Sequence, residues 1–169
     1  EVTLGTTDPK ILEKYIKETE YFSFNAKKSS EKLEMEKIYS EKSLEKLLPH
    51  YKFYNDKGIS SEVLRFFKAG LATQGHMYQR FVFPIYNSNS QIHGFSGRDM
   101  ANLENRPKWK HIGTKSKWSY PLYLADSNGE KPILKAIEDT QEVILVESIG
   151  DLLNLHENGI KNVLVTFGL

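Results

Sequence analysis

The chain has 169 residues, of which 39% are hydrophobic and 27% are charged, a composition typical of a globular protein with a real core. Its 23 basic and 22 acidic residues give a net charge of +1, which neither indicates nor excludes a nucleic-acid partner. Cysteine is absent, which excludes disulfides and thiolate zinc sites within these residues. No apolar run is long enough to cross a bilayer, so we expect no membrane partner.

Residues 1–42 are predicted to form a charged helical or linker segment. The apolar residues after Pro9 have the spacing of one amphipathic helix: Ile11, Leu12, Tyr15 and Ile16. The following run, Ser29–Ser43, carries charges of alternating sign. That run is either a second helix with charge pairs or a partly flexible linker.

Short helices are predicted next. Leu44, Leu47 and Leu48 have helical spacing, and a further helix is expected from Pro49 to Lys57, ending at Gly58. Ser60 or Ser61 should cap another helix, closed by Gly70, whose apolar face contains Val63, Phe66 and Phe67. These helices are interpreted as scaffold.

The spacing of the apolar residues then changes from that of a helix to that of the two strands of a β-hairpin. A strand is predicted at 81–85, a turn at 87–90 and a return strand that includes Ile92 and Phe95. Pro84 should place the first strand at an edge or beside a bulge, because proline cannot donate to a ladder. Gly94 and Gly97 indicate a bulge or close backbone packing more often than ligand approach.

The last segment has the pattern of a strand–helix–strand unit. A helix beginning near Pro132 should precede a strand at 143–146, whose continuous aliphatic run is typical of a parallel strand covered on both faces. A helix ending near Gly159 and a second buried strand follow. Glu147 then stands beyond the carboxyl end of the first strand, where open α/β sheets place their chemistry. By itself, such a carboxylate is either a helix anchor or a metal or proton-transfer group.

Basic and aromatic residues are interleaved between Arg98 and Lys117. The stretch contains Arg98, Arg106, Lys108, Trp109, Lys110, Lys115 and Lys117, with Trp118 next to it. Such a stretch can hold phosphates and stack bases, or it can be a solvated loop whose tryptophans fill the core. The 5 histidines are scattered without metal-ligand spacing, and neither a nucleophile elbow nor a Gly-rich phosphate loop is present.

Several blocks of sequence follow one another in a characteristic order. They are Tyr54–Val63 (YNDKGISSEV), Arg80–Tyr86 (RFVFPIY), Gln91–Arg98 (QIHGFSGR), Pro107–Lys110 (PKWK), Tyr120–Ala125 (YPLYLA) and Val146–Asp151 (VESIGD). The ordered series, which covers about residues 50–169, resembles the RNA-polymerase core of bacterial and phage DnaG-type primases.

The resemblance implies an α+β fold in three parts. These are the helical amino-terminal segment (1–42), a primase-core subdomain with a β-hairpin (43–117) and the opening βαβ unit of a TOPRIM α/β domain (118–169). It implies an enzyme that synthesises short RNA primers on single-stranded DNA from nucleoside triphosphates with Mg²⁺ or Mn²⁺. A replicative helicase is a further implied partner. The implied location is the bacterial cytoplasm, or the host cytoplasm for the phage or mobile-element enzyme that the divergent blocks favour.

The resemblance also implies roles for individual residues. Glu147 corresponds to the family's catalytic acid or base and, with Asp151, to part of a metal site, while Lys115 corresponds to a catalytic lysine. For Asp151 the alternative is a first-turn acid that stabilises the helix dipole. The residues expected to contact nucleotide or DNA are Arg80, Arg98, Lys108, Trp109 and Lys117.

Two departures from the family pattern qualify this expectation. Ser148 replaces the family glycine after the glutamate, and the sequence contains no Asp-x-Asp after Glu147. A single carboxylate cannot assemble a two-metal site, so we expect these residues alone to be inactive. The alternative function is a catalytically incomplete primase-like module that binds single-stranded DNA or a replisome protein. Another TOPRIM enzyme, a nuclease or topoisomerase, is disfavoured by the blocks that precede Glu147.

Overall fold

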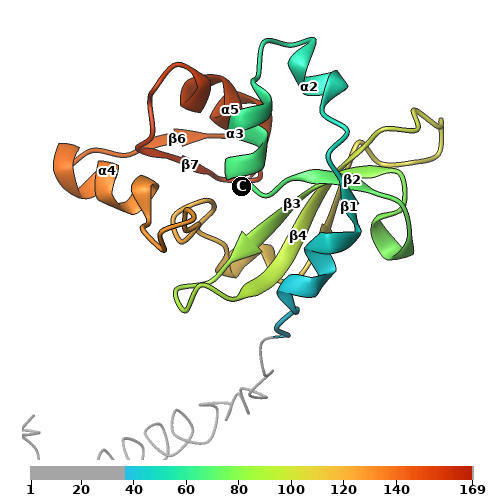
Figure 1. The fold of residues 1–169 in the computed structure, drawn as a ribbon, viewed down its shortest axis with the longest axis horizontal. Coiled ribbons are helices and arrows are strands. Elements are labelled where there is room, and N and C mark those ends of the chain that lie inside the picture. Colours follow the sequence, from blue (N-terminus) through green and yellow to red (C-terminus); the bar gives the residue numbers. More distant parts are fainter. Residues whose placement is uncertain (1–36, 169) are drawn as a thin grey trace, which may run out of the picture. The chain divides into compact units, whose positions relative to one another are not determined.

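The computed structural model describes residues 37–168, which belong to one compact unit containing two sheets (Figure 1). The larger sheet is antiparallel with strand order β1-β2-β3-β4-β5, and the smaller one pairs β6 with β7 in parallel. The mixed α+β class is therefore confirmed. The helix predicted after Pro9 and most of the run Ser29–Ser43 lie outside the described residues. No helix of the described part combines the length and apolarity needed to cross a membrane.

Short elements form the start of the described chain. They are the 3-10 helix η1 (Glu41–Lys46), β1 (Leu47–Leu48), α2 (Lys52–Asn55) and α3 (Ser61–Phe66). The predicted cap of α3 is confirmed, because the Ser60 hydroxyl accepts a hydrogen bond from the Val63 amide at 3.2 Å. Three predictions were wrong. Leu47 and Leu48 do not continue a helix from Leu44 but form strand β1. The helix expected from Pro49 begins only at Lys52, and α3 ends before Lys68, whose φ of 51° breaks the helix well ahead of Gly70.

Gly70 instead begins β2 (Gly70–Ala72), where the backbone approaches β1 closely. A Cβ at Gly70 would lie 2.8 Å from the carbonyl oxygen of Leu48. The glycine therefore serves strand packing rather than helix termination. After β2, the 3-10 helix η2 (Gly75–Met77) leads into the long hairpin.

The hairpin consists of β3 (Arg80–Tyr86) and β4 (Ile92–Asp99), and β5 (Trp109–Ile112) forms the edge of the sheet. The hairpin prediction is confirmed. Pro84 lies in β3 beyond the stretch paired with β2, which reaches only Val82, and the ladder to β4 shifts register between Ile85 and Tyr86. The prediction of an edge or bulge at Pro84 is thus correct locally, although β3 is a central strand of the sheet.

Gly94 lets the Trp118 indole lie directly on β4. A Cβ at this position would lie 2.6 Å from Cζ2 of Trp118 and 2.8 Å from the carbonyl oxygen of Ile112. Since the second contact is with backbone, a side-chain rotation cannot relieve it. Close backbone packing, the interpretation preferred from the sequence, is confirmed here.

Substituting Gly94→Ala should destabilise the chain by about 2 kcal/mol, because the added methyl group must displace Trp118 or the β5 backbone. Urea unfolding, followed by tryptophan fluorescence, measures the change. The matched control is Gly150→Ala in a helix, where the added Cβ meets only the Ser148 hydroxyl at 3.5 Å. The control should unfold at the wild-type urea concentration or above it. Equal stability of the two variants would contradict the assignment of close packing to Gly94.

The carboxyl-terminal part contains α4 (Pro132–Thr140), β6 (Ile144–Val146), α5 (Ile149–Glu157) and β7 (Val163–Val165). Strand, helix and strand follow in the predicted order, and β6 pairs with β7 in parallel. The expected burial of β6 on both faces was wrong. Val143, Ile144 and Leu145 are 46%, 39% and 62% exposed, since in the described part β6 has only β7 beside it and is packed by α5.

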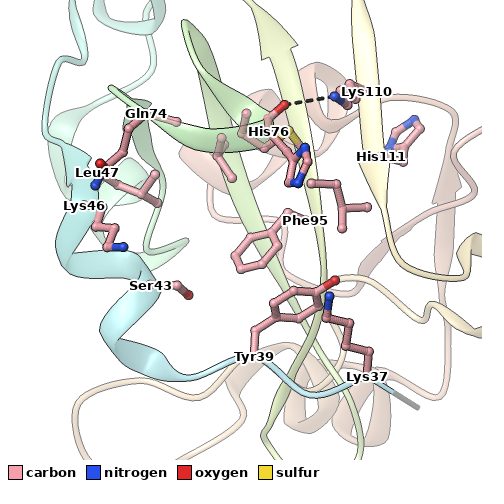
Figure 2. Close-up of a pocket in the computed structure, with 14 residues that line it drawn as sticks. Lys37, Tyr39, Ser43, Lys46, Leu47, Gln74, His76, Phe95, Lys110 and His111 are labelled. Atoms are coloured by element: carbon pink, nitrogen blue, oxygen red, sulfur yellow. Dashed lines mark hydrogen bonds between the residues drawn. The ribbon is translucent and has the colours of Figure 1, made fainter. Parts of the chain in front are cut away.

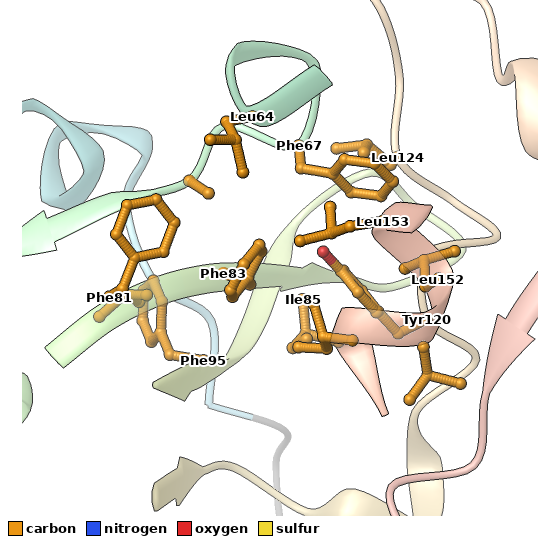
Figure 3. Close-up of a cluster of buried hydrophobic side chains, with 14 of the residues drawn as sticks. Leu64, Phe67, Phe81, Phe83, Ile85, Phe95, Tyr120, Leu124, Leu152 and Leu153 are labelled. Carbon is orange, nitrogen blue, oxygen red and sulfur yellow. The ribbon is translucent and has the colours of Figure 1, made fainter. Parts of the chain in front are cut away.

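One core joins the antiparallel sheet to the carboxyl-terminal unit (Figure 3). Phe83 and Ile85 of β3 lie in the same cluster as Leu152 and Leu153 of α5, and all four side chains are fully buried. Tyr120 bridges the two parts, since its carbonyl oxygen accepts from the Val165 amide at 2.9 Å. The end of β6 is therefore held at a defined place beside the larger sheet.

Helix α3 of the amino-terminal part and helix α5 of the carboxyl-terminal part lie side by side (Figure 1). The His156 ring stacks on Phe66 at 5.0 Å, and the Glu157 carboxylate accepts from the Ser60 amide at 2.8 Å. Burial lowers the pKa of His156 to about 4, with a further decrease from Lys161 that is opposed by Glu157. The imidazole is therefore neutral in the folded protein at neutral pH.

The lowered pKa of His156 predicts that the folded protein loses stability in mild acid. His156 has a pKa near 6.5 when unfolded and about 4 when folded, so its contribution is complete above pH 6.5 and is lost as the pH falls towards 4. We expect a loss of about 2 kcal/mol, allowing for partial exposure of the ring. Urea unfolding of wild type and His156→Phe at several pH values measures it. Parallel pH profiles for the two proteins would contradict the prediction.

Candidate functional site

A pocket of about 290 Å³ lies where the end of β6 faces the larger sheet. One wall comes from the junction of β6 and α5 and another from neighbouring positions of β4 and β5. The lining residues are Ser96, Trp109, His111, Glu147, Ser148, Ile149, Phe167 and Gly168. We call this the Glu147 pocket.

Glu147 reaches the pocket because β6 ends immediately before it and α5 begins shortly after it. Ser148 caps α5, since its hydroxyl accepts from the Asp151 amide at 3.3 Å. Ile149 is buried beneath the first turn, and the Glu147 side chain is exposed to the pocket. The predicted position at the carboxyl end of the strand is therefore confirmed, while its catalytic role stays a prediction.

Asp151 has a structural partner on its own helix. Its Oδ2 accepts a hydrogen bond from the Ser148 hydroxyl at 2.7 Å, and the same hydroxyl accepts from the Asp151 amide as the helix cap. The serine that replaces the family glycine thus donates to the carboxylate suggested as a second metal ligand, and this carboxylate does not line the Glu147 pocket. Across residues 37–168, no group of three or more His, Asp or Glu side chains is placed to hold a metal ion.

Two polar atoms on the sheet side of the pocket are buried without a hydrogen-bond partner. They are the Ser96 hydroxyl and Nδ1 of His111, which belong to directly paired residues of β4 and β5. Burial lowers the pKa of His111, and the positive charge of Lys115 lowers it further, so the ring is neutral near pH 7. Such atoms can bind a polar ligand group without first losing a protein partner.

Neither residue was among the site residues predicted from the sequence. Ser96 stands within the QIHGFSGR block, and His111 follows the PKWK block. Strand alternation could have indicated that they share a face with Phe83, but not that Glu147 would lie opposite them.

Lys115 lies beside the same pocket, in the 3-10 helix η3 (Lys115–Lys117). Its ammonium group donates to the carbonyl oxygen of Phe167 at 2.8 Å, and Phe167 lines the pocket. Lys117, in the same helix turn, is exposed. The structure thus places Lys115 next to a residue of the pocket that Glu147 lines, and its catalytic role stays a prediction.

Arg98 and Trp109 form a second group on this face of the sheet. They are directly paired across β4 and β5, and the Arg98 guanidinium lies 4.8 Å from the Phe53 ring and 5.9 Å from the Trp109 ring. Stacking between two aromatic rings fixes the plane of the guanidinium. Trp109 also lines the Glu147 pocket, so Arg98 is connected to that pocket through a shared side chain.

A neighbouring hollow of about 300 Å³ extends from Arg98 into the loop between β4 and β5. Arg106 and the exposed Lys108 line it together with Asp99. Most of the basic stretch is thus accessible, while Trp118 packs against His111 and Phe167. The predicted packing of a tryptophan against the core is therefore confirmed for Trp118, while phosphate and base binding by the stretch stays a prediction.

Arg80 does not face a template groove, which corrects the expectation from the family resemblance. Its side chain is buried, and Nη1 donates to the carbonyl oxygens of Gly97 at 3.2 Å and Pro107 at 3.0 Å. Asp99 lies 4.0 Å from Arg80 and forms a closer ion pair with Arg106 at 2.9 Å. The pKa of Arg80 is lowered by burial and by Arg106, against the opposing effect of Asp99. Arg80 is a structural clamp on the loop that carries Lys108.

Comparison with known proteins places the chain in a family. No family model matches it. Over 126 residues it is 32% identical to a DNA primase of Borreliella burgdorferi, an alignment that covers 69% of this chain and 22% of that protein. A DNA primase of Helicobacter pylori strain 26695 is 33% identical over 93 residues, covering 53% of this chain and 15% of that protein. The chain belongs to the DnaG-type DNA primases.

Solved primase structures have the same fold. The zinc-binding and RNA polymerase domains of the Aquifex aeolicus primase match with a TM-score of 0.61 and 23% identity, over 74% of this chain and 38% of that one. The DnaG primase catalytic domain bound to single-stranded DNA matches with a TM-score of 0.54 and 21% identity, over 71% and 46%. The chain spans 22% or less of these two curated primases.

Proposed function

We propose that this chain is part of a primase that synthesises short RNA primers on single-stranded DNA. The observation that carries the proposal is the meeting of Glu147, at the end of β6, with Ser96 and His111 around one pocket, beside which Lys115 bonds to the Phe167 carbonyl oxygen. This arrangement is found in a chain 32% identical to a primase. Phosphoryl transfer needs groups that position phosphates and act on developing charge, and such groups converge here.

Each side chain has a part to play in this proposal. Glu147 acts as acid or base at the reacting oxygens, and Lys115 and Lys117 attract the triphosphate. Arg98 and Lys108 bind template phosphates, and Trp109 offers a face for a base. Arg80 acts only through the loop that it holds.

Divalent metal belongs to the proposal as well. Mg²⁺ is commonly held by one or two carboxylates together with substrate phosphates, and bound metal would neutralise phosphate charge. Glu147 can supply one such carboxylate, whereas the Asp151 carboxylate accepts a hydrogen bond from the Ser148 hydroxyl. The described residues do not complete a magnesium site.

We further assign the unit of β6, α5 and β7 to the opening of a TOPRIM domain within residues 118–169. Its support is the parallel pairing of β6 with β7 across a helical crossover, with a carboxylate at the first strand end. By analogy with its bacterial relatives, the protein would work in the bacterial cytoplasm beside a replicative helicase. A phage source remains a prediction.

A binding module without catalysis is the second candidate function. It is favoured by one observation: among the described residues that line the Glu147 pocket, Glu147 is the only carboxylate. Under this alternative, the basic face would hold single-stranded DNA without extending a primer.

The two candidates are separated by a priming assay on the natural protein with single-stranded template, nucleoside triphosphates and Mg²⁺. RNA products that require template support the primase. Salt-dependent binding of a single-stranded oligonucleotide, weakened by Arg98→Ala and by Lys108→Ala, without any RNA product supports the binding module. Absence of both activities contradicts both candidates.

A further inference from the structure

A second hollow of about 520 Å³ lies on the other face of the antiparallel sheet (Figure 2). Directly paired residues of antiparallel strands share a face. Ser96 pairs with His111 on the face of the Glu147 pocket, whereas Phe95 pairs with Ile112 and both line this second hollow. We call it the basic pocket.

Positive charge surrounds the basic pocket. Three lysines stand on different sides of it in Figure 2: Lys37 before η1, Lys46 at the end of η1 and Lys110 in β5. No aspartate or glutamate is among the described residues that line it. Lys110 is held in place by a 2.9 Å hydrogen bond to the carbonyl oxygen of His76. A ligand that complements these lysines electrostatically is an anion with more than one negative charge.

The interior of the basic pocket is apolar and aromatic. The Tyr39 and Phe95 rings meet edge to face at 5.0 Å, and Lys37 lies 5.2 Å from the Tyr39 ring. Leu47, Val82 and Ile112 add aliphatic surface. A flat heterocycle could lie against this surface, with Gln74 available for hydrogen bonds to its edge and the Ser43 hydroxyl, which donates to the Ser40 carbonyl oxygen, available as an acceptor.

We propose that the basic pocket binds a free nucleoside polyphosphate, with the base against Tyr39 and the phosphates at the lysines. The volume lies in the range of pockets that enclose one small molecule. The site is separate from the Glu147 pocket, although His111 on the edge strand β5 contributes to the walls of both. The inference goes beyond the proposed priming function and does not depend on it.

ATP is the probe, titrated calorimetrically into the protein in the presence of EDTA, which removes metal needed for binding at a catalytic site. Lys46→Glu should weaken ATP binding roughly tenfold by reversing a charge at the phosphates. The matched control is Lys42→Glu, an exposed lysine of the same 3-10 helix that does not line the basic pocket. The control should bind ATP almost as wild type does.

A second comparison tests recognition of the base. Inorganic tripolyphosphate should bind several-fold more weakly than ATP, because it lacks the ring that stacks on Tyr39. Tyr39→Leu should reduce that difference and leave tripolyphosphate binding unchanged. Circular dichroism of each variant checks that the fold is retained.

Three outcomes would overturn the proposal. Equal losses in Lys46→Glu and Lys42→Glu would mean general attraction between charges, and equal affinities for ATP and tripolyphosphate would mean a phosphate site only. Binding of a thymidine oligonucleotide that is weakened by Lys46→Glu, with no binding of ATP, would assign the pocket to a nucleic-acid strand.

Discussion

Replacing Glu147 with glutamine is expected to reduce primer synthesis by the natural protein at least about a hundredfold, while binding of single-stranded DNA stays at the wild-type level. Glutamine keeps the size of the side chain and removes its charge, so it can neither take up a proton nor balance metal charge. The side chain is exposed at the pocket and makes no contact on which the core depends. The defect should therefore be chemical rather than structural.

The measurement is template-dependent RNA synthesis, with DNA binding followed in parallel by fluorescence anisotropy. Glu142→Gln is the matched control, since Glu142 is an exposed glutamate just before the opposite end of β6. It should retain full synthesis. Intact synthesis in Glu147→Gln would remove Glu147 from the catalytic site, and loss of synthesis in both variants would indicate a general effect of charge.

Replacing Arg80 with methionine is expected to destabilise the chain by about 3 kcal/mol. The change leaves the carbonyl oxygens of Gly97 and Pro107 without their donor and removes positive charge beside the buried Asp99. Methionine retains much of the aliphatic volume, so the loss reports mainly the polar contacts. Urea unfolding measures it.

Arg65→Met provides the control for Arg80→Met, because Arg65 is exposed and its side chain bonds only within its own helix, to the Ser61 carbonyl oxygen. That variant should lie within about 0.5 kcal/mol of wild type. Hydrogen exchange should also show faster opening of the 100–108 loop in Arg80→Met. Wild-type stability of Arg80→Met would mean that the guanidinium is not a clamp.

The local elements were predictable where one physical signal dominates. Ser60 as a helix cap, the β3–β4 hairpin and the placement of Glu147 after β6 all follow from capping, strand period and strand–helix order. The dependence of Gly70 on β1 was not predictable, because its cause is a strand far from it in sequence. Long-range packing overrides the local preference of glycine for helix ends.

The site was predictable only in part for a similar reason. An arginine next to a strand suggests a surface charge, and nothing local indicates that Arg80 is enclosed by two carbonyl oxygens and Asp99. Likewise, Ser96 and His111 become neighbours of Glu147 only through packing of the two sheets around a common core. Residue type and spacing carry no information about how closely the two sheets approach each other.

The shared core around Tyr120 has a consequence for the order of events in the proposed function. Tyr120 is 1% exposed, binds Val165 through its backbone and lies among side chains of both sheets. The strand end with Glu147 and the face with Arg98 therefore acquire their separation during folding, before any substrate arrives. Under the proposed function, a template strand would therefore meet two parts whose separation the shared core already sets, and a misplaced phosphate would fit poorly between them.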